Sequence, residues 1–152
     1  MNFISPSELN QLINSSDEIA VIDVREQGEF GKEHILLCAN IPLSHLEIKV
    51  PVLVPRKGTQ IVICDFGGEL SSRAFDVLIS YGYTNISILR GGVKAWKGEK
   101  FEVFCGINVP SKAFGEFVEH TYGTPSISAK ELKDMMDNKQ DFIVLDLSLI
   151  HI

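Results

Sequence analysis

The sequence predicts an α/β fold, a mainly parallel sheet of five strands flanked by helices. Short apolar runs, such as residues 19–24 (IAVIDV) and 59–64 (TQIVIC), are continuous rather than alternating, which is typical of strands covered on both faces. Stretches with helical spacing of apolar residues, such as residues 69–83, separate them. Strands that alternate with helices in this way form βαβ units, so their strands run parallel.

The remaining elements follow in chain order. We expect a capped helix at 5–14, the strand at 19–24, a polar segment with turn glycines at 26–35, a short extended piece at 38–43, a helix at 45–54, the strand at 59–64, the helix at 69–83, a strand at 85–89, a glycine turn and short helix at 91–96, and an irregular connection at 98–114. Because proline lacks the N–H that a helix needs, Pro51 is expected to cut its helix short.

Composition limits the classes of function. The chain has 152 residues, 45% of them hydrophobic, which is enough for one packed domain and part of another. The net charge of −6 argues against nucleic acid or a membrane surface as partner. No apolar run approaches about 18 residues, so no membrane span is expected. The first residues (MNFISPSELNQLINSS) lack the features of a signal peptide, which favours a cytoplasmic location.

The chain contains an internal repeat. Residues 4–24 align without a gap to residues 127–147, at a constant spacing of 123 positions. Identical residues recur at six aligned positions: Ile4, Ser5, Glu8, Leu9, Val21 and Asp23 match Ile127, Ser128, Glu131, Leu132, Val144 and Asp146. The repeat predicts a domain over 1–105, a connecting segment over 106–124 and the truncated start of a second repeat over 125–152.

The stretch IVICDFGGELSSR, residues 61–73, is expected to be a buried strand, a glycine turn and the start of a helix. Such a turn gathers backbone N–H groups and the helix dipole around one point, which makes an anion site. Cys64 stands where the strand ends. It is either a nucleophile whose thiolate this site stabilises or a small apolar residue of the core.

Three further stretches resemble the rhodanese-like (thiosulfate sulfurtransferase) family: VIDVREQGEF at 21–30, HILLCANIP at 34–42 and LISYGYTNISILRGGVKAW at 78–96. The resemblance covers roughly residues 4–104, with Leu37 where the family usually has glycine. It implies a rhodanese-like fold and a loop cysteine that carries sulfur from a small sulfur-containing anion or a persulfide donor. No cofactor is implied.

The motif residues outside the loop are expected to be structural. Asp23, Arg25 and Glu29 have the charges of an ion-pair cluster, and His34 is expected to be a hydrogen-bonded turn residue rather than a base. Trp96 is expected in the core. Since the three cysteines are far apart in sequence and the histidines are scattered, no metal site is predicted.

Register decides which residue stands at the family's nucleophile position. Counting back from Gly82, or from Gly91 and Gly92, places Asp65 there without a gap. The anion loop that follows Asp65 is then formed by Phe66, Gly67, Gly68, Glu69, Leu70 and Ser71, with Leu70 where the family's loop arginine stands. A carboxylate cannot carry sulfane sulfur, and it is expected to accept the loop N–H groups itself.

Two functions remain open at this point. The first is a rhodanese-like repeat with weak or no activity of its own, at the start of a longer multi-repeat sulfurtransferase. The second is an active enzyme that forms a persulfide on Cys64, which requires a one-residue insertion in the turn. The apolar tail, residues 142–152, further predicts a homodimer, because an exposed strand edge invites association.

Overall fold

A computed structural model describes residues 1–107, 111, 114–115, 118 and 121–145. The chain divides into two compact units, Met1–Phe114 and Gly115–Ile152, and each is described by itself. No helix among these residues has both the length and the apolar character that crossing a membrane requires.

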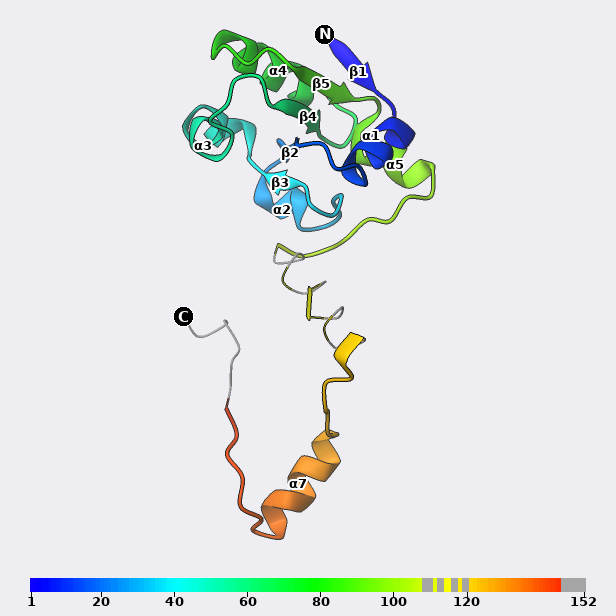
Figure 1. The fold of residues 1–152 in the computed structure, drawn as a ribbon, viewed down its shortest axis with the longest axis vertical. Helices are drawn as coiled ribbons and strands as arrows, with labels where there is room; N and C mark the ends of the chain where they lie inside the picture. Colours follow the sequence, from blue (N-terminus) through cyan, green and yellow to red (C-terminus); the bar gives the residue numbers. More distant parts are fainter. Residues whose placement is uncertain (108–110, 112–113, 116–117, 119–120, 146–152) are drawn as a thin grey trace. The chain divides into compact units, whose positions relative to one another are not determined.

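The first unit contains a single sheet with helices on both sides (Figure 1). Its elements are β1 (Asn2–Ile4), α1 (Pro6–Ile13), β2 (Ile19–Asp23), α2 (Gln27–Phe30), β3 (Ala39–Asn40), the 3₁₀ turn η1 (Leu43–His45), α3 (Leu46–Leu53), β4 (Gln60–Cys64), α4 (Leu70–Ser80), β5 (Ile86–Leu89) and α5 (Gly92–Gly98). The strand order is β1-β5-β4-β2-β3, and every pair is parallel. The predicted five-stranded parallel sheet is confirmed.

The central strands are apolar on both faces because each face has its own core. Along β4, Ile61 and Ile63 pack into the core that includes Leu78 of α4. Val62 and Cys64 point to the other face and pack into the core that includes Trp96 of α5. This alternation explains why β4 has a continuous apolar sequence rather than a period of two.

Helix α1 begins with a capping box that the second unit repeats. The Ser5 side chain accepts the N–H of Glu8, and the Glu8 carboxylate accepts the N–H of Ser5. In the second unit, α7 (Ala129–Asp137) has the same reciprocal bonds between Ser128 and Glu131. The aligned sequences therefore begin their helices with the same local structure.

The second unit differs from expectation after α7. Residues 142–145 correspond to the start of β2, but they lie outside regular secondary structure. Ile143, Val144 and Leu145 are exposed. The predicted second strand is therefore not formed at these residues, since a strand needs a neighbour for its backbone hydrogen bonds. Residues 146–152, on which the predicted tail contact also depends, lie outside the described part of the chain.

One further expectation about an element was wrong, and two short elements were not expected. Pro51 does not cut α3 short, because the helix continues through it to Leu53. The Val54 N–H still bonds to the Val50 carbonyl, so the end of the helix remains hydrogen bonded. The short strand β1 and the one-turn helix α2 were not predicted, since three or four residues are too few to show a period.

Candidate anion loop

The loop between β4 and α4 lies at the carboxyl end of a central strand, where parallel sheets generally bind ligands. Gly91 and Gly92 pack closely against the backbone of this loop. The Val93 N–H bonds to the Asp65 carbonyl at 2.8 Å. A side chain on Gly92 would collide with the backbone of Asp65 and Gly67, and Gly92 has a φ of +59°. The start of α5 therefore fixes the backbone of this loop.

The carboxylate of Asp65 occupies the centre of the loop. Its Oδ1 accepts the N–H groups of Gly67 and Gly68, at 2.6 and 3.0 Å. Its Oδ2 accepts the N–H of Ser71 in the first turn of α4, at 3.0 Å. Asp65 is only 3% exposed. The expectation that this carboxylate accepts the loop N–H groups is confirmed. The positive end of the α4 helix dipole stabilises the negative charge of the carboxylate.

Ser71 contributes a second polar group to the loop. Its residue is 2% exposed, and its hydroxyl has no hydrogen-bond partner among the described residues. An unpaired buried hydroxyl costs roughly 1–3 kcal/mol. Only the backbone N–H of Ser71 donates to the Asp65 carboxylate, so its hydroxyl is a donor of the loop that remains unused.

Cys64 lies behind the loop rather than in it. It is fully buried, and its Sγ is 3.5 Å from the Sγ of Cys38. The hydrogen bond with Cys38, burial and the nearby Asp23 together raise the pKa of the Cys64 thiol well above its usual value, and Arg25 offsets only part of this. At neutral pH the thiol is protonated, so it is a poor nucleophile.

The expected ion-pair cluster forms only in part. Arg25 makes a two-pronged pair with Asp23, with an Nη2–Oδ2 distance of 2.6 Å, and both residues are buried. Glu29 is not a member: it lies on the surface and pairs with Lys32. Lys32 stands three residues after Glu29, so the surface lysine is within reach of its carboxylate. The inclusion of Glu29 in the cluster was wrong.

His34 and Trp96 are structural, as expected. The His34 ring stacks on Phe30 at a centroid distance of 3.8 Å, and its Nδ1 lies 3.0 Å from the Phe30 carbonyl oxygen. The indole N–H of Trp96 donates to the Glu102 carbonyl. Both residues are buried, and each has a backbone carbonyl as its polar partner.

Leu70 lines a cavity of about 330 Å³ that sequence reasoning did not identify, together with Val24, Glu26, Leu43, Ser44 and Arg73. Arg73 lies one turn beyond the position where the family's loop arginine is expected. Arg73 is therefore the positively charged residue of α4, and it lines the same cavity as Leu70. The only available signal was its helical spacing from Leu70.

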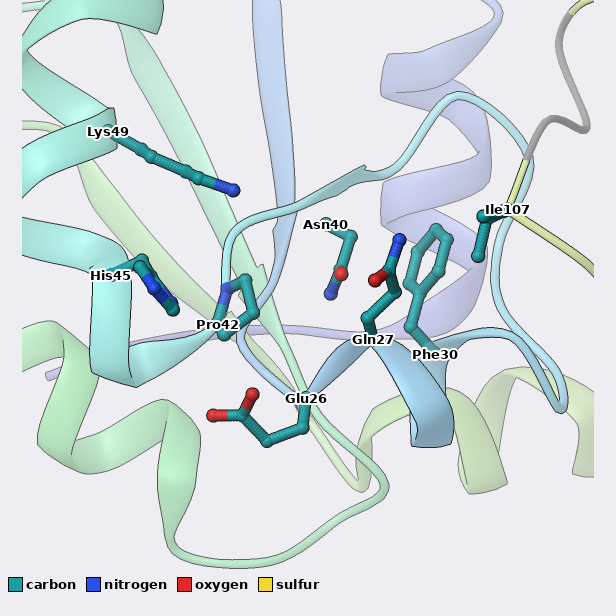
Figure 2. Close-up of a pocket in the computed structure, with 8 residues that line it drawn as sticks. All are labelled: Glu26, Gln27, Phe30, Asn40, Pro42, His45, Lys49 and Ile107. Carbon is teal, nitrogen blue, oxygen red and sulfur yellow. The ribbon is translucent and has the colours of Figure 1, made fainter. Parts of the chain in front are cut away.

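A second cavity of about 260 Å³ lies between α2 and α3 (Figure 2). It is lined by Glu26, Gln27, Phe30, Asn40, Pro42, His45, Lys49 and Ile107, none of which belongs to the loop. At its rim the Ser44 hydroxyl lies 2.8 Å from a Glu26 carboxylate oxygen and 3.0 Å from His45 Nδ1. This cavity is separate from the anion loop and shares only Glu26 with the cavity beside Leu70.

Comparison with known proteins identifies the relatives of this chain. The family model described as "Rhodanese-like domain" matches residues 5–99. The uncharacterized protein YibN of Escherichia coli K12 is 28% identical over 104 residues, which cover 68% of this chain and 72% of YibN. The thiosulfate sulfurtransferase PspE of the same organism is 32% identical over 73 residues, covering 48% of this chain and 69% of PspE.

A solved structure matches more of the chain. The thiosulfate sulfurtransferase of Pseudomonas aeruginosa is 37% identical, with a TM-score of 0.83 over 91% of this chain. This chain spans only 26% of that protein. The similarity extends beyond the first unit, because 91% of the chain is longer than the first unit, which ends at Phe114.

Proposed function

Because the chain belongs to the rhodanese-like domain family, we propose that it is a sulfurtransferase-type domain whose own loop has weak or no activity on thiosulfate. One observation carries this proposal: the Asp65 carboxylate accepts three N–H groups of the loop at 2.6–3.0 Å. Those donors are the groups that would otherwise stabilise an anionic sulfur species. A bound carboxylate excludes such a species by both volume and charge.

The state of Cys64 further supports the proposal. In the active alternative, a Cys64 thiolate attacks the outer sulfur of thiosulfate, forms a persulfide and releases sulfite. That reaction needs an accessible thiolate. Cys64 is fully buried, and its raised pKa keeps the proton on sulfur. No observation on the described residues favours the active alternative over the inactive one.

We also propose that residues 1–105 are the N-terminal repeat of a longer multi-repeat protein, with a connecting segment at 106–124 and a second repeat starting at 125. The repeated capping boxes of Ser5 and Ser128 support this organisation. The Pseudomonas aeruginosa protein supports it too, since the match covers only 26% of that protein. In such a protein this repeat would provide structure, substrate docking or regulation. A cytoplasmic location is also proposed, since three unpaired cysteines suit a reducing compartment.

Intact mass spectrometry after incubation with thiosulfate tests the function. Cys105 is exposed and could take up sulfur by itself, so the experiment starts from Cys105→Ser. We expect no added sulfur on this protein, and none on its Cys64→Ser derivative. Addition of one sulfur that Cys64→Ser abolishes would contradict the proposal and establish the active alternative.

The variant Asp65→Cys provides the matched positive test. A thiolate at this position would face the same three loop donors, which lower a thiol pKa. We expect it to retain one sulfur after thiosulfate treatment in the Cys105→Ser background. Cyanide should then remove the sulfur as thiocyanate and restore the original mass.

A further inference from the structure

Three adjacent strands bring two thiols and a carboxylate together in the interior. Asp23 ends β2, Cys64 ends β4 and Cys38 immediately precedes β3. One potential ligand atom from each residue lies within 4.8 Å of the other two, and all three residues are buried. The proposed function, in which the Asp65 carboxylate fills the anion loop, assigns no role to this group of side chains.

The two thiols are not positioned for a disulfide. Asp23 pairs with Cys64 on one side and with Asn40 of β3 on the other, so β2 lies between the two cysteines. Strands are about 4.8 Å apart, which separates their backbones by roughly 9–10 Å. A disulfide requires Cα atoms closer than about 7 Å. The side chains converge to a Sγ–Sγ distance of 3.5 Å across β2 instead.

We propose that Cys38, Cys64 and Asp23 form a binding site for one thiophilic divalent cation, Zn²⁺ or Cd²⁺. The two sulfurs are already near the required spacing. A tetrahedral zinc ion with Zn–S bonds of about 2.3 Å places its sulfurs roughly 3.7–3.8 Å apart. The Sγ atoms therefore separate by only a few tenths of an ångström on binding.

Charge balance favours a divalent ion over a monovalent one. Asp23 and Arg25 form a buried pair with no net charge, and the Arg25 Nη2 also donates to the Glu33 carbonyl. Two thiolates neutralise a dication, so the loaded site is neutral as a whole. A monovalent ion held by both thiolates would leave one uncompensated negative charge in the core, which is costly.

Binding exchanges protons for the metal without any redox change. Each thiol releases one proton to solvent and forms one metal–sulfur bond, so two protons leave for each cation bound. Asp23 Oδ2 supplies the third ligand. Arg25 Nε now donates to both carboxylate oxygens, and on binding it donates to Oδ1 alone while Nη2 stays on Oδ2. Affinity must therefore rise with pH. Cys38 is the entry point because it is 8% exposed, whereas Cys64 is fully enclosed.

Cadmium titration of the reduced full chain at mildly alkaline pH tests the site, with sulfur-to-cadmium charge-transfer absorption as the readout. The third cysteine, Cys105, is exposed and provides the matched control. Wild type and Cys105→Ser should bind one cation each and show the absorption. Cys38→Ser and Cys64→Ala should lose it while retaining the native far-ultraviolet circular dichroism.

Zinc-dependent thermal unfolding gives an independent measurement. Zinc should raise the Tm of wild type and Cys105→Ser, and leave the Tm of Cys38→Ser unchanged. Absorption that persists in Cys38→Ser would overturn the proposal, because Cys38 is the more accessible ligand. So would absorption that disappears in Cys105→Ser, or a folded wild type that shows none.

Discussion

The backbone nitrogen of Ser71 lies 3.0 Å from Oδ2 of Asp65, so a carboxylate at the end of β4 caps the helix that follows it. Glu69 stands at the N-cap position of α4 but makes no capping bond. The capping group therefore comes from four residues earlier in the loop. This relationship connects the stability of the domain to Asp65, the residue that we propose stands at the nucleophile position.

Replacing Asp65 with alanine should lower the free energy of unfolding by about 1–3 kcal/mol. The change removes one acceptor group from the N–H groups of Gly67, Gly68 and Ser71. Urea unfolding followed by circular dichroism measures the loss. Asp76→Ala, at an exposed position of α4, is the control and should change stability by less than about 0.5 kcal/mol.

The same variant should regain stability when sulfate or thiosulfate is added. Without the carboxylate, the loop donors and the Ser71 hydroxyl are free to bind an oxyanion. Tm should therefore rise with sulfate concentration in Asp65→Ala more than in wild type at equal ionic strength. Equal sulfate responses in the two proteins would contradict this description of the loop.

Gly92→Ala should be among the most destabilising single changes in the domain, with a loss of about 2–4 kcal/mol. The new Cβ would collide with the backbone of Asp65 and Gly67. Gly98→Ala in the same helix is the matched control, since nothing lies within 4 Å of its added Cβ. The control should be neutral or stabilising in thermal unfolding.

Leu37→Gly should stabilise the protein or leave its stability unchanged, although leucine is larger and apolar. Leu37 has a φ of +65° and is 63% exposed, so it combines backbone strain with little burial. Relief of a left-handed leucine is worth about 1–2 kcal/mol, and the entropy of glycine in the unfolded chain offsets about half of this. Ile79→Gly, on an exposed position of α4, should lose about 1 kcal/mol in the same urea assay.

Stability should decline at alkaline pH because of Cys64. Its pKa is raised in the folded state, so above about pH 8.5 the unfolded chain loses this proton while the folded protein keeps it. Fewer protons on the unfolded state mean that unfolding becomes easier as pH rises, by at most about 1.4 kcal/mol per pH unit. Cys64→Ala should show a shallower decline in urea unfolding between neutral and alkaline pH.

Local patterns predicted most of the fold. The apolar run of β4 and the helical spacing of α4 were sufficient to place the loop between them. The capping sequences at Ser5 and Ser128 correctly placed the starts of two helices. The expectation at Pro51 was wrong because a local rule competed with the rest of the helix. Strand β1 was not predicted because three residues are too few to show a period.

The sequence by itself determined that Asp65 follows the strand and precedes the glycine turn, because a strand, a turn and a helix start are all read within a dozen residues. Only the tertiary structure decided what surrounds Cys64. The thiol of Cys38, which is 26 positions away along the chain, reaches the Cys64 thiol across β2. Such contacts depend on which strands become neighbours, and the pairing of parallel strands joins segments that no local period connects.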